Sequence, residues 1–324
     1  MMDISIIVGT VVKIAIVVTI TMLHVAYAVY FERKVIGHMQ ARLGPMRVGP
    51  HGLLQPIADF VKLFFKEDVV PSNADKPIFL IAPVISVVAA LASLAVIPLW
   101  ETFAIANINI GILYILALSS VGAYGIILAG WSSNSKYSFL GALRSCAQVI
   151  SYEIAMGLSL VGIIMLAGST NLIDIVNAQS KYPFILTQPV AFFVFLMAAI
   201  AETNRAPFDL PEAETELVAG YFTEYSGMRF GLFFVAEYVG MFIMSAIAAI
   251  CFLGGWKGPH FWIFSHVPNI VWFLLKVYAL IFFYYWIRAT LPRYRYDQLM
   301  SLGWKLFIPL TLANIFVTGL VKLL

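Results

Sequence analysis

Eight long apolar runs dominate this 324-residue chain and limit the folds that it can adopt. Each run is close to the roughly 20 residues that a helix needs to cross the hydrocarbon core of a bilayer. The chain is 61% hydrophobic and 11% charged, whereas a soluble domain is about half apolar and about a quarter charged. Because a helix satisfies its own backbone hydrogen bonds in lipid, we expect an all-α polytopic membrane protein.

The apolar runs set the expected helices, and we expect them to form a single membrane domain over residues 1–324. The expected spans are Ile4–Tyr30, Ile78–Leu99, Ile110–Gly130, Ala147–Ala167, Phe184–Ala201, Phe230–Leu253, Ile270–Ile287 and Leu306–Leu323. The loop after the first span also predicts an amphipathic helix that lies at the membrane interface. Its apolar face would comprise Leu54, Ile57, Val61, Phe64 and Phe65.

The basic residues predict the orientation of the chain in the membrane. Of the 20 Lys and Arg, 15 lie in loops that follow odd-numbered spans, three lie on the opposite side of the membrane and two lie deeper within spans. Cytoplasmic loops carry the excess of basic residues, so the N-terminus is expected outside. The first apolar run is too long for a signal-peptide core and lacks a basic segment before it, so we expect no cleavage. The net charge of +3 does not indicate nucleic acid.

The chain is not expected to carry a redox group or a metal ion. Cys146 and Cys251 are its only cysteines, whereas an iron–sulfur cluster needs about four thiolates. They are expected near opposite membrane faces, which argues against a disulfide. His260 and His266 form only a weak metal pair, and the glycine-rich nucleotide motifs are missing. Electrons in any redox reaction would therefore come from another subunit.

A stretch between residues 201 and 224 carries six of the 17 acidic residues of the chain. These are Glu202, Asp209, Glu212, Glu214, Glu216 and Glu224. Pro207 and Pro211 predict a break in the helix here. Carboxylates beside apolar spans are costly, and closely spaced ones titrate together, so the cluster indicates proton transfer or a polar ligand. The alternative is a solvated acidic loop.

Other ionisable residues fall inside or at the ends of the expected spans. Glu153 and Glu237 are candidates for proton transfer together with Glu202, because acids within a membrane are rarely there without a function. The alternative for Glu153 and Glu202 is simple contact with water at the inner boundary. Lys276 would either extend to an interface or pair with an acid.

The first inner loop holds a second group of charged residues, Glu32, Arg33, Arg42 and Asp59. Arginines beside carboxylates at a membrane face can hold a polar headgroup at the mouth of an apolar cavity. The alternative is ordinary inner-side charge with helix caps. Basic residues near the seventh span, namely Arg288, Arg293 and Arg295, are interpreted as topology anchors.

Two long motifs resemble those of a known family. They are FERKVIGHMQARLGPMRVGPHGLLQPIADFVKLFFKED, residues 31–68, and AETNRAPFDLPEAETELVAGYFTEYSGMRFGLFFVAEY, residues 201–238. Both resemble the inner loops of a membrane subunit of respiratory complex I, which is called the H subunit in bacteria and subunit 1 in mitochondria. Residues 129–153 and 287–310 support the resemblance.

The resemblance implies a subunit of a proton-translocating NADH:quinone oxidoreductase in a bacterial inner membrane. Such a subunit forms much of the quinone-binding chamber and starts an acidic proton-coupling path. Quinone would bind together with partner subunits, and this chain would hold no FMN, iron–sulfur cluster or catalytic residue. The implied partners are the peripheral-arm iron–sulfur and quinone-site subunits, the antiporter-like and small membrane-arm subunits, and the lipid bilayer, with no nucleic acid.

Roles transfer only to residues that match the family motifs. The resemblance assigns Glu32, Arg33, Arg42, Asp59, Phe208 and Asp209 to the quinone chamber. It assigns Glu153, Glu202, Glu212, Glu214, Glu216 and Glu237 to the proton path. The chain departs from the family at Met46, where a polar residue is usual, and in the third span, where Ser119 and Ser120 are present but no acid is found.

Two other functions fit the same fold. Homologous subunits occur in membrane-bound nickel–iron hydrogenases and ferredoxin-linked complexes, where the acids would transfer protons without a long quinone chamber. A stand-alone ion transporter would be expected to have paired halves with broken helices, and the sequence lacks that internal symmetry.

Overall fold

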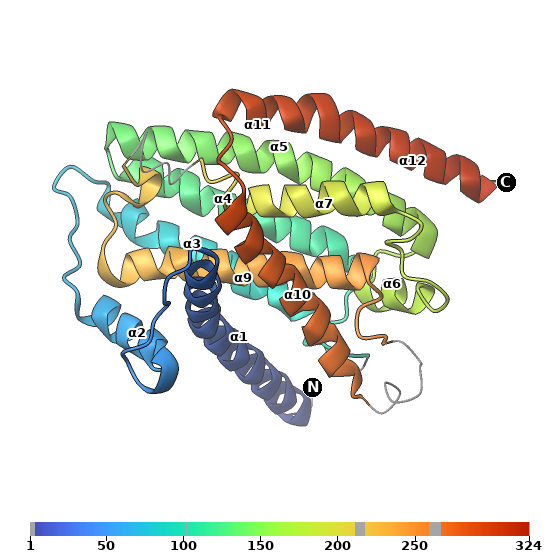
Figure 1. Cartoon of the computed structure of the whole chain (residues 1–324), viewed down its shortest axis with the longest axis horizontal. Coiled ribbons are helices and arrows are strands. Elements are labelled where there is room, and N and C mark those ends of the chain that lie inside the picture. Colours follow the sequence, from blue (N-terminus) through green and yellow to red (C-terminus); the bar gives the residue numbers. More distant parts are fainter. Residues whose placement is uncertain (1–3, 102, 211–217, 259–266, 324) are drawn as a thin grey trace.

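The computed structural model describes residues 4–101, 103–210, 218–258 and 267–323. Figure 1 shows a helical bundle in which α3, α4, α5, α7 and α9 run along the long axis, while α1 and α10 cross them obliquely. The helices are α1 Ile4–Met39, α2 Gln55–Phe65, α3 Lys76–Ser93, α4 Gly111–Ser132, α5 Lys136–Ala167, α6 Leu172–Ala178, α7 Pro189–Glu202, α9 Gly227–Phe252, α10 Asn269–Thr290, α11 Tyr296–Leu302 and α12 Ile308–Leu323. The all-α fold class is confirmed.

Seven helices of the described ranges are long and apolar enough to cross a membrane. The last of these spans, residues 296–323, consists of α11 and α12, which are joined by a short π-helical turn. The remaining expected span is α7, which has 14 residues. Pro189 starts α7 because its ring fixes a helical φ and its missing N–H is not needed in the first turn. Residues 184–187 form turns instead of the first turn of the expected helix.

Two helix ends differ from the sequence prediction. The first helix continues to Met39 rather than ending at Tyr30, so Glu32 and Arg33 lie on a helix and not in a loop. The fourth span begins at Lys136 rather than Ala147. Its added turns carry Lys136 and Arg144, and the small residues Ser138, Gly141 and Ala142 are buried where α5 contacts residues 220–222. A Cβ added to Gly141 would lie only 2.7 Å from the Cα of Gly220, so glycine permits this close approach.

The helix α9 is the centre of the bundle. Within its apolar window, 72% of the residues are buried inside the chain, compared with 17% for the last span. Its partners include α3, α7 and α10. Side chains from α5, α7 and α9 form the main core, for example Tyr152, Phe195 and Phe252. The polar groups described below therefore lie beside the best-packed part of the molecule.

The predicted amphipathic helix is confirmed as α2, which stands beside the bundle near the end of α1 (Figure 1). None of its residues is buried, and its apolar face remains uncovered within the chain. Ile57, Phe64 and Phe65 are 57%, 62% and 79% exposed. Asp68, just beyond α2, pairs with Arg229 at the start of α9 at 2.9 Å. The position of α2 at a membrane interface stays a prediction.

Candidate functional site

Three buried charged side chains meet between α1, α9 and the loop after α7. Nη1 of Arg205 lies 3.2 Å from Oε1 of Glu32, and Nε of Arg205 lies 2.5 Å from Oε1 of Glu237. The side chains of Arg205, Glu32 and Glu237 are 7%, 4% and 14% exposed. Because a buried charge is tolerated only when it is paired, the single guanidinium holds both carboxylates. We call these three residues the ion cluster.

Two further side chains complete the surroundings of the ion cluster. The hydroxyl of Tyr238 donates to Oε2 of Glu32 at 2.7 Å, and Arg288 of α10 contacts the other oxygen of the same carboxylate. The Cζ of Arg205 lies 4.4 Å from the centre of the Tyr238 ring, within cation–π range. Burial by itself lowers the pKa of Arg205, but the carboxylates of Glu237 and Glu32 contribute to holding this pKa well above its usual value. Arg205 therefore stays charged.

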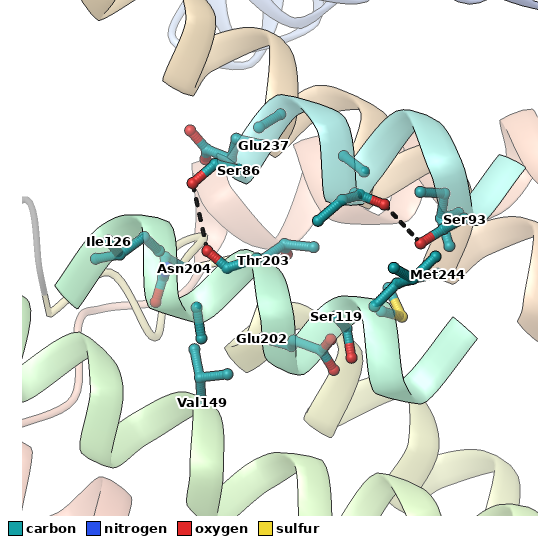
Figure 2. Close-up of a pocket in the computed structure, with 18 of the residues that line it drawn as sticks. Ser86, Ser93, Ser119, Ile126, Val149, Glu202, Thr203, Asn204, Glu237 and Met244 are labelled. Carbon is teal, nitrogen blue, oxygen red and sulfur yellow. Dashed lines mark hydrogen bonds between the residues drawn. The ribbon is translucent and has the colours of Figure 1, made fainter. Parts of the chain in front are cut away.

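A cavity of about 120 Å³ opens beside the ion cluster, between α3, α4, α9 and the end of α7. Its polar lining comprises Ser86, Ser93, Ser119, Glu202, Thr203, Asn204, Tyr221 and Glu237. Figure 2 shows Glu237 with Ser86 at one side of the view and Glu202 with Ser119 at the other. Because one water needs roughly 10–15 Å³ of such space and several polar partners, the cavity can hold several waters. Glu237 belongs to both the ion cluster and the cavity.

Two carboxylates from different helices lie near Ser119: Glu202 lines the cavity, and Glu153 lies behind Ser119. Glu202 is the last residue of α7, and its buried Oε2 has no hydrogen-bond partner within the described ranges. Glu153 of α5 accepts a hydrogen bond from Ser119 at 3.0 Å and another from Ser120. Glu202 and Glu237, which the sequence singled out, therefore line one polar cavity, and Glu153 is joined to its wall through Ser119.

The four charged residues that the sequence placed together in the first inner loop, Glu32, Arg33, Arg42 and Asp59, do not form one cluster. Glu32 faces the bundle and joins the ion cluster, whereas Arg33 is half-exposed and pairs with Asp59 of α2 at 2.8 Å. Successive helical residues point about 100° apart, which separates the two. Nε of Arg42 donates to Oε1 of Gln40 at 2.8 Å on the exposed surface. The Arg33–Asp59 pair joins α2 to α1.

The loop after α7 also carries Phe208 and Asp209. Phe208 is buried, and its ring centre lies 5.6 Å from that of Tyr294 and 5.8 Å from that of Tyr152. Its carbonyl accepts a hydrogen bond from Gln148 at 2.8 Å. Asp209 lies within electrostatic range of Glu237. Phe208 thus anchors the loop that carries Arg205, and Asp209 adds negative charge beside the ion cluster.

The sequence does not predict the side chains that surround Glu32, namely Arg205, Arg288 and Tyr238. In the sequence, Arg205 and Arg288 are interpreted only as inner-side basic residues, and Tyr238 is not singled out. The available signal is local: Arg205 follows Glu202 by three residues, and Tyr238 directly follows Glu237. Nothing in the sequence links either pair to Glu32, which lies 173 residues from Arg205 and 206 from Tyr238.

Of the two roles expected for Lys276, pairing with an acid is not seen among the described residues, and its ammonium binds backbone carbonyls. Its ammonium donates to the carbonyls of Leu253, Gly255 and Lys257 at 2.6, 2.8 and 2.7 Å. These carbonyls follow the end of α9, where helix geometry leaves acceptors without an intrahelical donor. Lys276 therefore ties the end of α9 to α10.

Several predicted residues lie outside the described ranges. These are Glu212, Glu214 and Glu216 of the acidic stretch, and the histidines His260 and His266. Both cysteines are described and are free thiols. In the rest of the described chain, no group of three or more His, Cys, Asp or Glu side chains is arranged to hold a metal ion.

Comparison with known proteins finds relatives that carry the same name. The chain is 55% identical over 335 residues to an NADH-quinone oxidoreductase H subunit, numbered 1, of Geobacter sulfurreducens, covering 97% of this chain and 95% of that protein. It is 55% identical over 317 residues to the NADH-quinone oxidoreductase H subunit of Thermomicrobium roseum, covering 92% and 91%. A sequence model of the family described as NADH dehydrogenase matches residues 12–319. The chain therefore belongs to the NADH dehydrogenase family.

Proposed function

We propose that the chain is the H subunit of a proton-translocating NADH:quinone oxidoreductase in a bacterial inner membrane. In this proposal it forms much of the wall of the quinone chamber and the first part of an acidic path for protons. Family membership and the names of its relatives support this assignment. The redox groups belong to partner subunits, and this chain contributes binding surface and titratable groups.

The ion cluster is the observation that carries the proposal. Glu32 belongs to the group assigned to the quinone chamber, and Glu237 belongs to the group assigned to the proton path. Arg205 contacts both carboxylates in a buried setting. Electrostatic interactions are stronger there than in water because the effective dielectric constant is lower. A change of charge near Glu32 would therefore alter the proton affinity of Glu237 through Arg205.

The cavity provides the continuation of the path. Glu237 and Glu202 both line it, so waters held there would link the two carboxyl groups by hydrogen bonds. A proton leaving Glu237 would pass along these waters to Glu202. Glu237 would then carry a negative charge opposite Arg205, and Glu202 would become neutral. Reduction of quinone in the partner-lined chamber would drive this change through the ion cluster.

The quinone side of the proposal rests on the surface around α1 and α2. The exposed apolar face of α2 suits an isoprenoid tail, and the Arg33–Asp59 pair beside it is polar. Quinone sites combine such apolar walls with a few polar groups. Phe208 and Asp209 lie in the second loop assigned to the chamber.

Substitution of Glu237 tests the proposed function. The variant Glu237→Gln is compared with Glu101→Gln, an exposed acid in a loop, in the intact complex within inverted vesicles. We expect Glu237→Gln to remove most NADH-driven acidification with quinone, while NADH oxidation by a water-soluble acceptor that bypasses quinone stays normal. Labelling the same vesicles with an azido-quinone should modify residues 32–66 or 208–229. Normal acidification in Glu237→Gln, with all label on other subunits, would overturn the proposal.

A further inference from the structure

Glu153 is held by two hydroxyl groups of the neighbouring helix. The Oγ atoms of Ser119 and Ser120 both donate to the same oxygen, Oε1 of Glu153, although the serines lie on α4 and the carboxylate lies on α5. The helices α4 and α5 pack side by side along the bundle (Figure 1). Two donors on one oxygen fix the orientation of the carboxylate.

Each hydroxyl also has a second acceptor within reach. The carbonyl of Leu116 lies 2.9 Å from Oγ of Ser119 and 3.2 Å from Oγ of Ser120. A serine hydroxyl has a single proton, so it donates either to Glu153 or to this carbonyl. When Glu153 carries a proton, a hydroxyl can turn to the carbonyl and accept from the carboxyl group. The serines can therefore remain hydrogen-bonded in both protonation states of Glu153.

Ser119 also faces the other carboxylate. It lines the cavity together with Glu202, and Figure 2 shows the two side chains next to each other. Oε2 of Glu202 is buried and has no hydrogen-bond partner among the residues that the structure describes. A buried carboxylate oxygen without a donor is costly, which makes it a ready acceptor for a proton or a hydroxyl hydrogen. Ser119 is thus flanked by the two acids.

We propose that Ser119 and Ser120 are positioning residues for proton transfer between Glu153 and Glu202, with the Ser119 hydroxyl as the connecting group. This inference rests on the proposed function. In the transfer, the carboxyl proton of Glu153 moves to Oγ of Ser119 while the original hydroxyl proton moves to Glu202. One O–H bond breaks and one forms at the serine, so its hydroxyl is restored. Ser120 keeps Glu153 in place during the exchange.

A purely structural role would look different. Intramembrane serines commonly bond to a carbonyl of their own helix, as Ser159 does with Met156 at 2.6 Å. Ser119 and Ser120 have that option at Leu116 and still converge on a carboxylate of another helix. The helix α4 carries no acid. The hydroxyls of Ser119 and Ser120 thus supply the hydrogen-bond donors and acceptors that proton transfer needs.

The test uses alanine and threonine variants in the intact complex within inverted vesicles. The double variant Ser119→Ala/Ser120→Ala is compared with Ser119→Thr/Ser120→Thr, which keeps both hydroxyls, and with Ser159→Ala, which removes a buried intramembrane hydroxyl elsewhere on α5. We expect the alanine pair to lower NADH-driven acidification about tenfold, because hydrogen bonds to a charged group are lost. Its pH profile should also change, because two hydrogen bonds to the Glu153 carboxylate are lost. Threonine should restore both properties.

Infrared spectroscopy gives a readout that altered packing alone would not reproduce. The carboxyl band that disappears in Glu153→Gln should move to higher frequency in the alanine pair and stay in place in Ser159→Ala. If Glu153→Gln and Glu202→Gln stop acidification while the alanine pair keeps normal acidification, pH profile and carboxyl band, the inference about the serines is wrong and the proposed function stands. If both glutamine variants pump normally, the proposed acid path itself is wrong.

Discussion

At the scale of residues, Arg205 decides how the buried charges of this protein are arranged. Among the described residues, it is the only side chain that forms ion pairs with both Glu32 and Glu237. Arginine suits this role because its planar fork offers several fixed donors and it remains protonated at any physiological pH. The ion cluster thus holds one fixed positive charge between two groups that can change theirs.

Two substitutions of Arg205 should distinguish the effect of its positive charge from the effect of its forked guanidinium group. Arg205→Ala leaves two carboxylates buried without their shared partner, so we expect a loss of about 3–5 kcal/mol in stability. Arg205→Lys keeps the charge but not the fork, so the complex should assemble and couple poorly. Thermal unfolding of the purified complex and NADH-driven acidification measure the two effects. Arg293→Ala, which removes an exposed arginine, should change neither; equal behaviour of all three variants would contradict the assigned role.

The acids of the site could be predicted from the sequence, whereas their partners could not. Glu153 and Glu237 stand out because a charge within an apolar run is conspicuous. Ser119 and Ser120 carry no such signal, since serine is common in membrane helices and satisfies itself on its own backbone. Their convergence on Glu153 depends on the packing of α4 on α5, which hydropathy does not encode.

At the scale of elements, close helix contacts explain where the sequence prediction of boundaries failed. Apolar length predicts that a helix exists, and it did so for each of the long spans. The first turns of α5 carry Lys136 and Arg144 and lie before the expected span, yet they are helical, and small residues there let α5 lie against residues 220–222. The amphipathic face of α2 was predictable because its spacing is local. Contacts between segments far apart in the sequence leave no such local pattern, so the sequence does not predict them.

A substitution at Gly141 should test this packing. A Cβ there would meet the backbone of Gly220 at 2.7 Å, which cannot move as a flexible side chain can. We expect Gly141→Ala to destabilise the fold by about 1–3 kcal/mol through overpacking. Gly157→Ala on the same helix is the control, because its Cβ would meet only Leu116 at 4.0 Å. The melting temperature in detergent distinguishes them, and equal melting temperatures would refute the close contact.

At the scale of the whole molecule, the apolar exterior and the uneven distribution of basic residues predict how it sits in the bilayer. The last span is mostly uncovered, with Phe316 and Val321 each 68% exposed. Lys136 begins α5 at the end of the bundle near α2, whereas Lys181 follows α6 at the opposite end (Figure 1). The excess of basic residues around the α2 end predicts that this end faces the cytoplasm.

Labelling with a membrane-impermeant thiol reagent should reveal this orientation. In a background with Cys146→Ser and Cys251→Ser, Lys136→Cys should react in inverted vesicles and Lys181→Cys in right-side-out vesicles. Both positions are accessible, since Lys181 is exposed and Lys136 lies in a surface hollow beside Asp75 and Asn134. The opposite pattern would place the N-terminus inside and reverse the predicted topology.

The shortness of α7 has a consequence for the membrane voltage. Its 14 residues rise about 21 Å, less than the roughly 30 Å of a hydrocarbon core. If one end of α7 lies near a membrane surface, Glu202 at the other end lies at depth, next to a space that can hold water. Moving a full charge across 100 mV is worth about 2.3 kcal/mol. A proton that reaches Glu202 through that space crosses only a fraction of the membrane potential. The rest of the potential sets the electrical work needed to move the proton onward from Glu202.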